Sequence, residues 1–195
     1  MKRLIDPDFK YHRSVCQVAV EIVRSLADSL IIPFNISDYA WGLEMNRQTL
    51  DKGFGSRLQQ IVSNYPDLQK VIEGFKKDVH EFERTLSQID RKDPMAIRMI
   101  NDQLLFLEKA FLDSEGLPSR PQKKHLIFAE SINDAYAGNS FAGLVDLLFD
   151  IDKLQADRLA ERWKEIQHHF SVLLNAIQAA GYTLRDVVKF VEETY

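Results

Sequence analysis

Residues 68–89, LQKVIEGFKKDVHEFERTLSQI, are the stretch that decides the fold class. Their apolar side chains recur at alternating steps of three and four positions, which is the spacing of one face of an α-helix. The apolar positions are Leu68, Val71, Ile72, Phe75, Val79, Phe82, Leu86 and Ile89. Such a seam is buried only when other helices cover it, so the segment predicts one member of a helical bundle.

Apolar residues at helical spacing also occur in the part of the chain before this seam. An apolar stripe over residues 12–30 ends near Pro33, because proline disfavours helix at the residue before it. A second helix is expected to begin at Ser37, whose hydroxyl can cap a free first-turn amide. Gly53 and Gly55 predict a kink or a break near the middle of that helix.

Four more helices are expected after the seam. Asp93 and Pro94 predict the start of the first, with the aspartate as cap and the proline in the first turn, and Gly116 would end it. The others are expected over about 139–150, over about 155–180 up to Gly181, and after Thr183 as an N-cap.

Residues 117–138 lack helical spacing and are bordered by glycine and proline. They predict a long ordered loop, which inside a compact domain is often functional. A short extended piece at Leu126-Ile127-Phe128 is an alternative for part of it. Because no period-two pattern is long enough to build a sheet, the sequence predicts an all-α helical bundle with antiparallel neighbours.

The composition narrows the classes of partner. Of the 195 residues, 45% are apolar and 28% are charged, and the net charge is −4. This balance gives no general attraction to nucleic acid, so none is expected as a partner. No apolar run approaches the roughly 18 residues of a membrane span. The single cysteine, Cys16, excludes an intrachain disulfide and is expected to be a small buried packing residue.

Five histidines are the candidates for metal or acid–base chemistry: His12, His80, His125, His168 and His169. None lies in a His-Glu-x-x-His spacing, and the adjacent His168 and His169 point about 100° apart on a helix. Each is expected at the surface. No nucleophile stands beside a base at a recognisable spacing, so no complete catalytic site is predicted in this chain.

Longer stretches carry a resemblance to a known family. They are Asp6–His12 (DPDFKYH), Met95–Gly116, Leu117–Pro121, Tyr136–Phe141, Asp146–Asp152 and Ala176–Leu184. Through them the chain resembles the C-terminal part of the glutamate carboxypeptidase II (N-acetylated-α-linked acidic dipeptidase) family, which shares its architecture with the transferrin receptor. The resemblance implies that residues 1–45 are the tail, with the terminal helix, of a missing α/β zinc-metallopeptidase domain. Residues 46–195 would then form a helical, transferrin-receptor-like dimerisation domain.

The resemblance also implies site residues in a full-length parent. His12 would be a zinc ligand, with Tyr11 beside the metal in contact with substrate. Tyr136 would contact the carboxylate of the substrate's C-terminal residue. Ala135 stands where glutamate-preferring members have a lysine, so selectivity for a terminal glutamate is not implied. His12 alone is one ligand where catalytic zinc needs about three, so the isolated chain is expected to be no enzyme and to hold no cofactor.

The function implied is therefore to mediate a homodimer and to contribute a substrate-pocket loop to a zinc carboxypeptidase-like parent. The partners are a second copy of the chain and the upstream protease domain, and the parent is expected outside the cytoplasm, either extracellular or periplasmic. Two alternatives stay open: a catalytically inactive receptor-type homologue and an unrelated helical protein-interaction module. The retained His12 and Tyr136-Ala137-Gly138 count against the receptor type.

Overall fold

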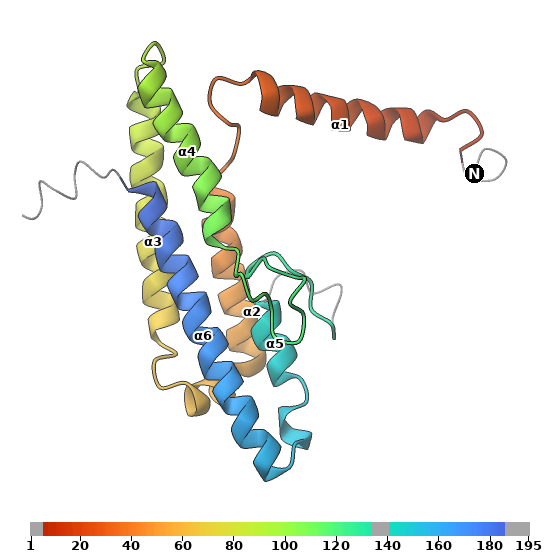
Figure 1. Cartoon of the computed structure of the whole chain (residues 1–195), viewed down its shortest axis with the longest axis vertical. Helices are drawn as coiled ribbons and strands as arrows, with labels where there is room; N and C mark the ends of the chain where they lie inside the picture. Colours follow the sequence, from red (N-terminus) through yellow and green to blue (C-terminus); the bar gives the residue numbers. More distant parts are fainter. Residues whose placement is uncertain (1–5, 134–140, 186–195) are drawn as a thin grey trace, which may run out of the picture.

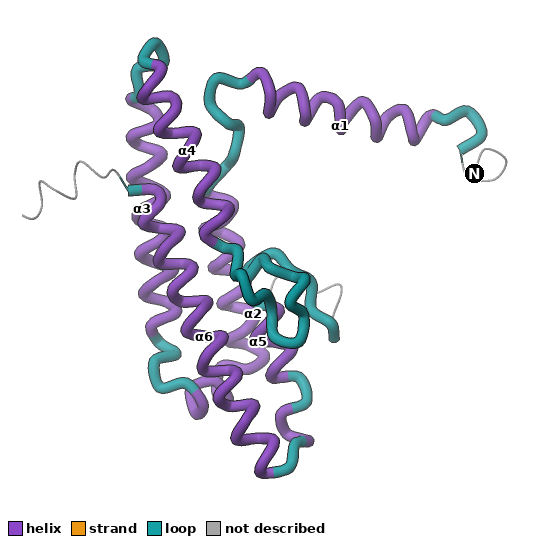
Figure 2. The backbone as a smooth tube through the Cα atoms, in the orientation of Figure 1, coloured by secondary structure: helices purple, strands orange, loops and turns teal. Residues whose placement is uncertain are grey.

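The computed structural model describes residues 6–133 and 141–185, and within them the fold is all-α, as predicted (Figure 2). The described ranges contain no β-strand, only the isolated bridges Leu112 to His125 and Leu117 to Arg120. In chain order the helices are α1 (Lys10–Asp28), α2 (Ser37–Ile61), α3 (Asp67–Gln88), α4 (Pro94–Ala110), α5 (Ala142–Leu148), the 3-10 turn η1 (Ile151–Lys153) and α6 (Ala156–Leu184).

Helices α2, α3, α4 and α6 form the bundle, with α5 beside its lower half (Figure 1). α6 packs against α3, α4 and α5, while α2 packs against α3. Four phenylalanines are its largest fully buried side chains: Phe75, Phe111, Phe141 and Phe170. Since burying one such side chain contributes about 1.5–3 kcal/mol, this shared core is what holds the helices together.

The seam in residues 68–89 faces this core, as predicted. Its buried members are Leu68, Ile72, Phe75, Val79 and Phe82. Val71, Leu86 and Ile89 are partly buried against the same cluster. The apolar spacing of α3 therefore marks the face that meets α2 and α6.

The start of α4 is also confirmed, but its end is not. The Asp93 carboxylate accepts hydrogen bonds from the amides of Met95 (2.9 Å) and Ala96 (3.3 Å), so it caps the helix. The helix ends at Ala110 rather than at Gly116. Phe111 leaves the helix to enter the core, and the chain then turns toward residues 123–125.

The ends of α2 and α6 differ from the sequence prediction as well. Ser37 is the first residue of α2 and not its cap, because its hydroxyl donates to Glu83 (2.5 Å) across to α3. α2 runs through both mid-helix glycines without a break. α6 continues past Gly181 to Leu184, since Gly181 and Leu184 are both buried in the bundle.

Thr183 lies inside α6 and caps no helix. Its hydroxyl donates to the carbonyl of Ala180 (2.7 Å), one turn earlier. The final helix expected after it would lie in residues 186–195, outside the described residues.

α1 projects sideways from the upper end of the bundle (Figure 1). None of its residues is buried, and its apolar stripe is exposed, from 44% at Leu26 to 68% at Val15. Cys16 is exposed too, so its predicted burial is wrong; it lies on a helix that stands away from the core. In the part of the chain that the structure describes, neither α1 nor any other helix is long and apolar enough to span a membrane.

Asn101 of α4 fixes the linker between α1 and α2. Its side-chain amide donates to the carbonyl of Leu30 (3.0 Å) and its side-chain oxygen accepts from the amide of Ile32 (2.9 Å). The predicted boundary between residues 45 and 46 falls within α2, where Leu43 and Leu50 belong to one core. The division of the chain into a metallopeptidase tail and a bundle stays a prediction, and α2 would be the helix that joins the two parts.

Candidate functional site

The first candidate site lies at the start of α1, where a carboxylate orients His12. Oδ2 of Asp6 lies 2.6 Å from Nδ1 of His12 and accepts from the His12 backbone amide at 3.0 Å. The Asp6 side chain is only 3% exposed, whereas that of His12 is 45% exposed. Burial alone would raise the pKa of Asp6, but its hydrogen bonds to His12, with the amides of Tyr11 and Lys10, bring the pKa below its usual value.

This geometry suits a metal-ligating histidine. Ligand histidines usually bind a carboxylate through one ring nitrogen, which fixes the ring and its tautomer and leaves the other nitrogen for the metal. In His12 the nitrogen bound to Asp6 is Nδ1. Nε2 is therefore the atom that could bind a borderline metal such as zinc.

The other predicted site residues are only partly described. Tyr11 precedes His12 in the first turn of α1, and its side chain is largely exposed, at 73%. Tyr136 and Ala135 lie outside the described residues. Among the residues that the structure does describe, no three His, Cys, Asp or Glu side chains are grouped to hold a metal ion. His12 and Asp6 thus form one potential ligand with its support.

The second candidate site is the loop between α4 and α5, whose irregular course over 117–133 was predicted. Asp146 of α5 fixes its later part. One carboxylate oxygen accepts from the Ser131 hydroxyl (2.5 Å) and the Ile132 amide (3.0 Å), and the other from Arg120 (2.7 Å). Arg120 also donates to the carbonyl of Glu130 (2.7 Å). The Arg120–Asp146 pair is 8–10% exposed, so it is a buried ion pair that clamps two parts of one loop.

His125 fixes the earlier part of the loop. Its Nδ1 accepts from the amides of Ile127 and Phe128, both at 3.2 Å, and Nε2 lies 3.3 Å from Glu108 of α4. Its ring stacks on Phe111. Burial lowers the pKa of His125, against the attraction of Glu108. The predicted surface position of this histidine is therefore wrong.

The loop is held by α2 and by its own backbone as well. The buried Asn46 of α2 donates to the carbonyl of Ile127 (3.2 Å). Gly116 has a φ of 78°, and a side chain there would meet the backbone of Pro121 at 2.6 Å. Asn133, which donates to Asp146, and the buried Phe141 mark fixed points on either side of residues 134–140.

His169 is a buried residue that the sequence analysis misplaced at the surface. It is 5% exposed and lies against Gly143, and it lines a cavity of about 330 Å³ together with Asp113 and Glu165. Burial, helped by His168 and opposed by Asp113, lowers its pKa to about 4. A usable signal was present, because position 169 lies three residues after the apolar Ile166, on the core side of α6.

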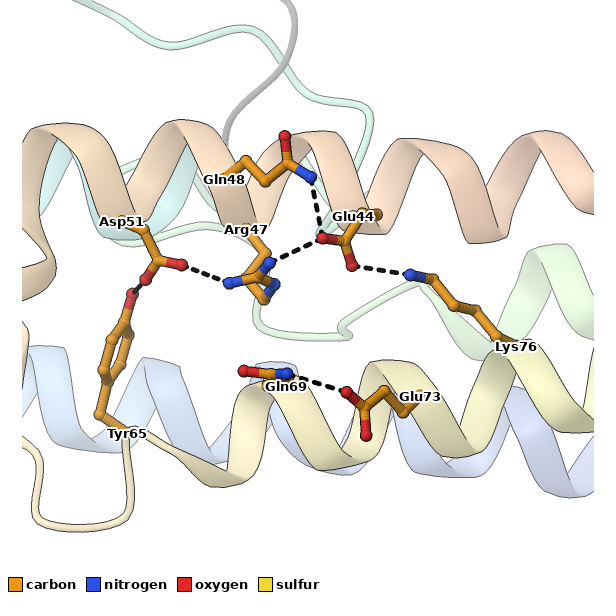
Figure 3. A network of polar contacts seen from close by, with 8 residues as sticks. All are labelled: Glu44, Arg47, Gln48, Asp51, Tyr65, Gln69, Glu73 and Lys76. Atoms are coloured by element: carbon orange, nitrogen blue, oxygen red, sulfur yellow. Dashed lines mark hydrogen bonds and ion pairs between the residues drawn. The ribbon is translucent and has the colours of Figure 1, made fainter.

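A polar network braces α2 against α3 (Figure 3). Glu44 accepts from Arg47 (2.6 Å), Lys76 (2.7 Å) and Gln48 (2.9 Å), which together lower its pKa to about 2, with Arg47 the largest cause. Arg47 also pairs with Asp51, which accepts from the hydroxyl of Tyr65. Since its carboxylates are paired within the network, this cluster stabilises the bundle rather than offering free groups for catalysis.

Comparison with known proteins agrees with this architecture. Residues 63–185 match the family described as the transferrin receptor-like dimerisation domain. The chain is 27% identical over 186 residues to mouse (Mus musculus) "Aminopeptidase NAALADL1", covering 94% of this chain and 24% of the relative. It is 29% identical over 188 residues to "Probable glutamate carboxypeptidase LAMP1" of Arabidopsis thaliana, covering 95% and 26%. A third relative is "Glutamate carboxypeptidase 2 homolog" of Caenorhabditis elegans, 22% identical over 202 residues, covering 95% and 26%.

The chain thus spans about a quarter of the length of these curated relatives. Its matched residues include the whole of α3, α4, α5 and the central helix α6. The chain therefore belongs to the transferrin receptor-like dimerisation domain family of glutamate carboxypeptidase-like proteins.

Proposed function

We propose that this chain pairs two copies of a zinc-dependent carboxypeptidase-like protein and supplies part of its substrate pocket. The observation that carries the proposal is the family match over residues 63–185, which contains α3, α4, α5 and α6 of the bundle. Exposed apolar residues outside that core, such as Met95 at 69% and Phe106 at 51%, support a self-associating surface. Localisation of the parent outside the cytoplasm belongs to the same proposal and follows from the family resemblance.

Sedimentation of the chain at micromolar concentration tests the pairing. We expect a two-fold dimer, because closed two-fold pairs are the commonest way to bury a self-complementary surface. A chain lacking residues 1–28 is the control, since α1 exposes an apolar stripe of its own. A monomeric chain contradicts the proposal, and so does a dimer that disappears when α1 alone is removed.

In the full-length parent, we propose that zinc is held by His12 through Nε2 together with ligands from upstream. The Asp6–His12 pair supports this role, because it fixes the ring with Nε2 left for a metal. When bound, zinc polarises a substrate carbonyl and lowers the pKa of a bound water. Tyr11, in the same helical turn, would donate its phenolic hydrogen to a developing oxyanion.

The substrate-pocket part of the proposal concerns the loop that contains Tyr136. It is supported by the clamps on either side of residues 134–140, namely the bonds from Asp146 to residues 131–133 and the buried Phe141. These contacts tie the described residues on both sides of that segment to the bundle. Ala135 carries no charge, so a neutral terminal side chain suits this site better than a glutamate.

A further inference from the structure

α4 is the helix of the bundle with two apolar faces. Its inner face is buried through Ile97, Ile100, Leu104 and Leu107. On the opposite face Met95, Met99 and Phe106 are 69%, 42% and 51% exposed. These three positions are four and seven residues apart, so they fall within about 40° of one another around the helix axis.

An outer apolar stripe is unusual for a surface helix. A helix with one buried face normally carries polar residues on the other, and a helix that is apolar on both sides is normally covered on both. α3 follows the rule, because its outer positions Lys70, Glu73 and Lys77 are charged and exposed. The outer stripe of α4 therefore indicates a surface that a partner covers.

We propose that the outer face of α4, defined by Met95, Arg98, Met99, Asp102 and Phe106, is the contact through which two copies of this chain pair. The proposal rests on the proposed function as a dimerisation domain and adds the location of the contact. A family match that includes all of α4 favours a second copy as the occupant.

The charges on this face are self-complementary. Arg98 and Asp102 lie one turn apart, with Nε and Oδ2 at 3.6 Å, and their side chains are 74% and 52% exposed. When two α4 helices cross antiparallel about a two-fold axis near residue 100, Arg98 of each copy meets Asp102 of the other. A two-fold symmetric contact contains each such pair twice, once on either side of the axis, so two Arg98–Asp102 attractions stabilise the dimer.

The same register also pairs the apolar residues. An axis near residue 100 brings Met95 of one copy to Phe106 of the other, with Met99 close to the axis. Thioether sulfur and aromatic rings make favourable contacts, and methionine adapts to an irregular surface. Lys109, whose Nζ lies 5.3 Å from the centre of the Phe106 ring, would stand at the rim. A standard interface buries roughly 1,600 Å² in total, so this stripe forms its centre and neighbouring surfaces its edge.

Two charge-reversal variants test the contact, measured by sedimentation and by native mass spectrometry. Arg98→Asp gives a copy with two negative charges on this face, and Asp102→Arg gives a copy with two positive charges. We expect each variant alone to dimerise at least about tenfold more weakly than the wild type, because like charges then face each other twice. An equimolar mixture of the two should recover the dimer as a mixed pair, which a purely structural effect on α4 would not produce.

The controls separate this surface from the proposed function. Circular dichroism should show both variants folded, since both positions are exposed. Phe106→Ala should weaken the dimer, while Phe149→Ala, at a 54% exposed position beyond α5, should leave it unchanged. A wild-type dimer that neither reversal weakens overturns the location and leaves the proposed function standing. A monomeric wild type overturns the proposed function itself.

Discussion

The Arg120–Asp146 clamp shows what one residue contributes to the loop. We expect Asp146→Asn to lower the free energy of unfolding by roughly 3–5 kcal/mol, because it leaves the buried Arg120 without its counter-charge. Urea denaturation measures the change. Asp150→Asn is the matched control: its pair with Lys153 is 52% and 80% exposed, so a loss below about 1 kcal/mol is expected. Equal losses would mean that the clamp carries no special stability.

His169 should make the stability of the chain depend on pH. The unfolded histidine has a pKa near 6.5, while burial lowers the pKa of the folded one to about 4. Between these values the unfolded chain takes up a proton that the folded chain excludes. The stabilisation is complete above pH 6.5 and is lost as the pH falls toward 4, by up to about 3 kcal/mol.

Urea titrations at several pH values check this dependence as the difference between wild type and His169→Gln. An exposed histidine that does not act on His169 supplies the control: the His80→Gln variant should keep the wild-type slope. A His169→Gln variant that loses stability with acid as steeply as the wild type would show that another group is responsible.

Gly143 is constrained by the same histidine. A methyl group at this position would overlap the imidazole of His169, whereas one at Gly53 would have no atom within 4 Å. We expect Gly143→Ala to destabilise the bundle by about 1–3 kcal/mol, as overpacking does. Gly53→Ala should instead stabilise it by about 0.5–1 kcal/mol, because it removes backbone freedom within a helix. Thermal unfolding of both variants tests this expectation. Melting temperatures that shift in the same direction in the two variants would contradict the overlap at Gly143.

At the scale of the element, the projecting α1 should contribute little to the bundle. None of its side chains is buried, so removing residues 1–28 should change the free energy of unfolding by less than about 0.5 kcal/mol. The Asn101 contacts to the linker remain in this shortened chain. Differential scanning calorimetry tests the expectation. A large loss of stability would place α1 against the bundle in solution.

Helix identity could be read from the sequence, but helix ends and burial could not always be. Apolar spacing located the face of α3, and the Asp93-Pro94 pair located the start of α4, because both signals are local. The end of α6 depends on contacts between distant helices: Gly181 lies against Asp78 of α3, where a side chain would be 2.5 Å from the carboxylate. Local propensity favours an end at that glycine, and packing overrides it.

Some site residues could likewise be predicted from local sequence signals, whereas others depend on contacts between distant residues. The motif at residues 6–12 pointed to His12, but not to Asp6 as the group that orients its ring, since that contact depends on the turn before α1. The clamp between Arg120 and Asp146 joins residues 26 positions apart, beyond the reach of spacing arguments. His169 was misplaced because a histidine was weighed by its polarity and not by its position on the helix.

At the scale of the whole molecule, the Asp6–His12 pair should matter only in a full-length parent, where other ligands complete the site. There Asp6→Asn should weaken zinc binding by about 10- to 100-fold, as the loss of a carboxylate behind a ligand histidine does. Competition with a fluorescent chelator measures the affinity. Asp8→Asn is the control, because Asp8 is 71% exposed and pairs only loosely with Lys10, at 3.8 Å. Unchanged zinc affinity in Asp6→Asn would remove the metal role of this pair.

The central position of α6 in the bundle determines when the bundle can fold during translation. α6 covers α3, α4 and α5, yet it follows all of them along the chain. While the ribosome is still translating α6, the inner faces of these helices remain open to chaperones. The inner face of α4 is buried only after α6 has packed against it. Subunits of a longer protein would therefore fold first, and only then meet.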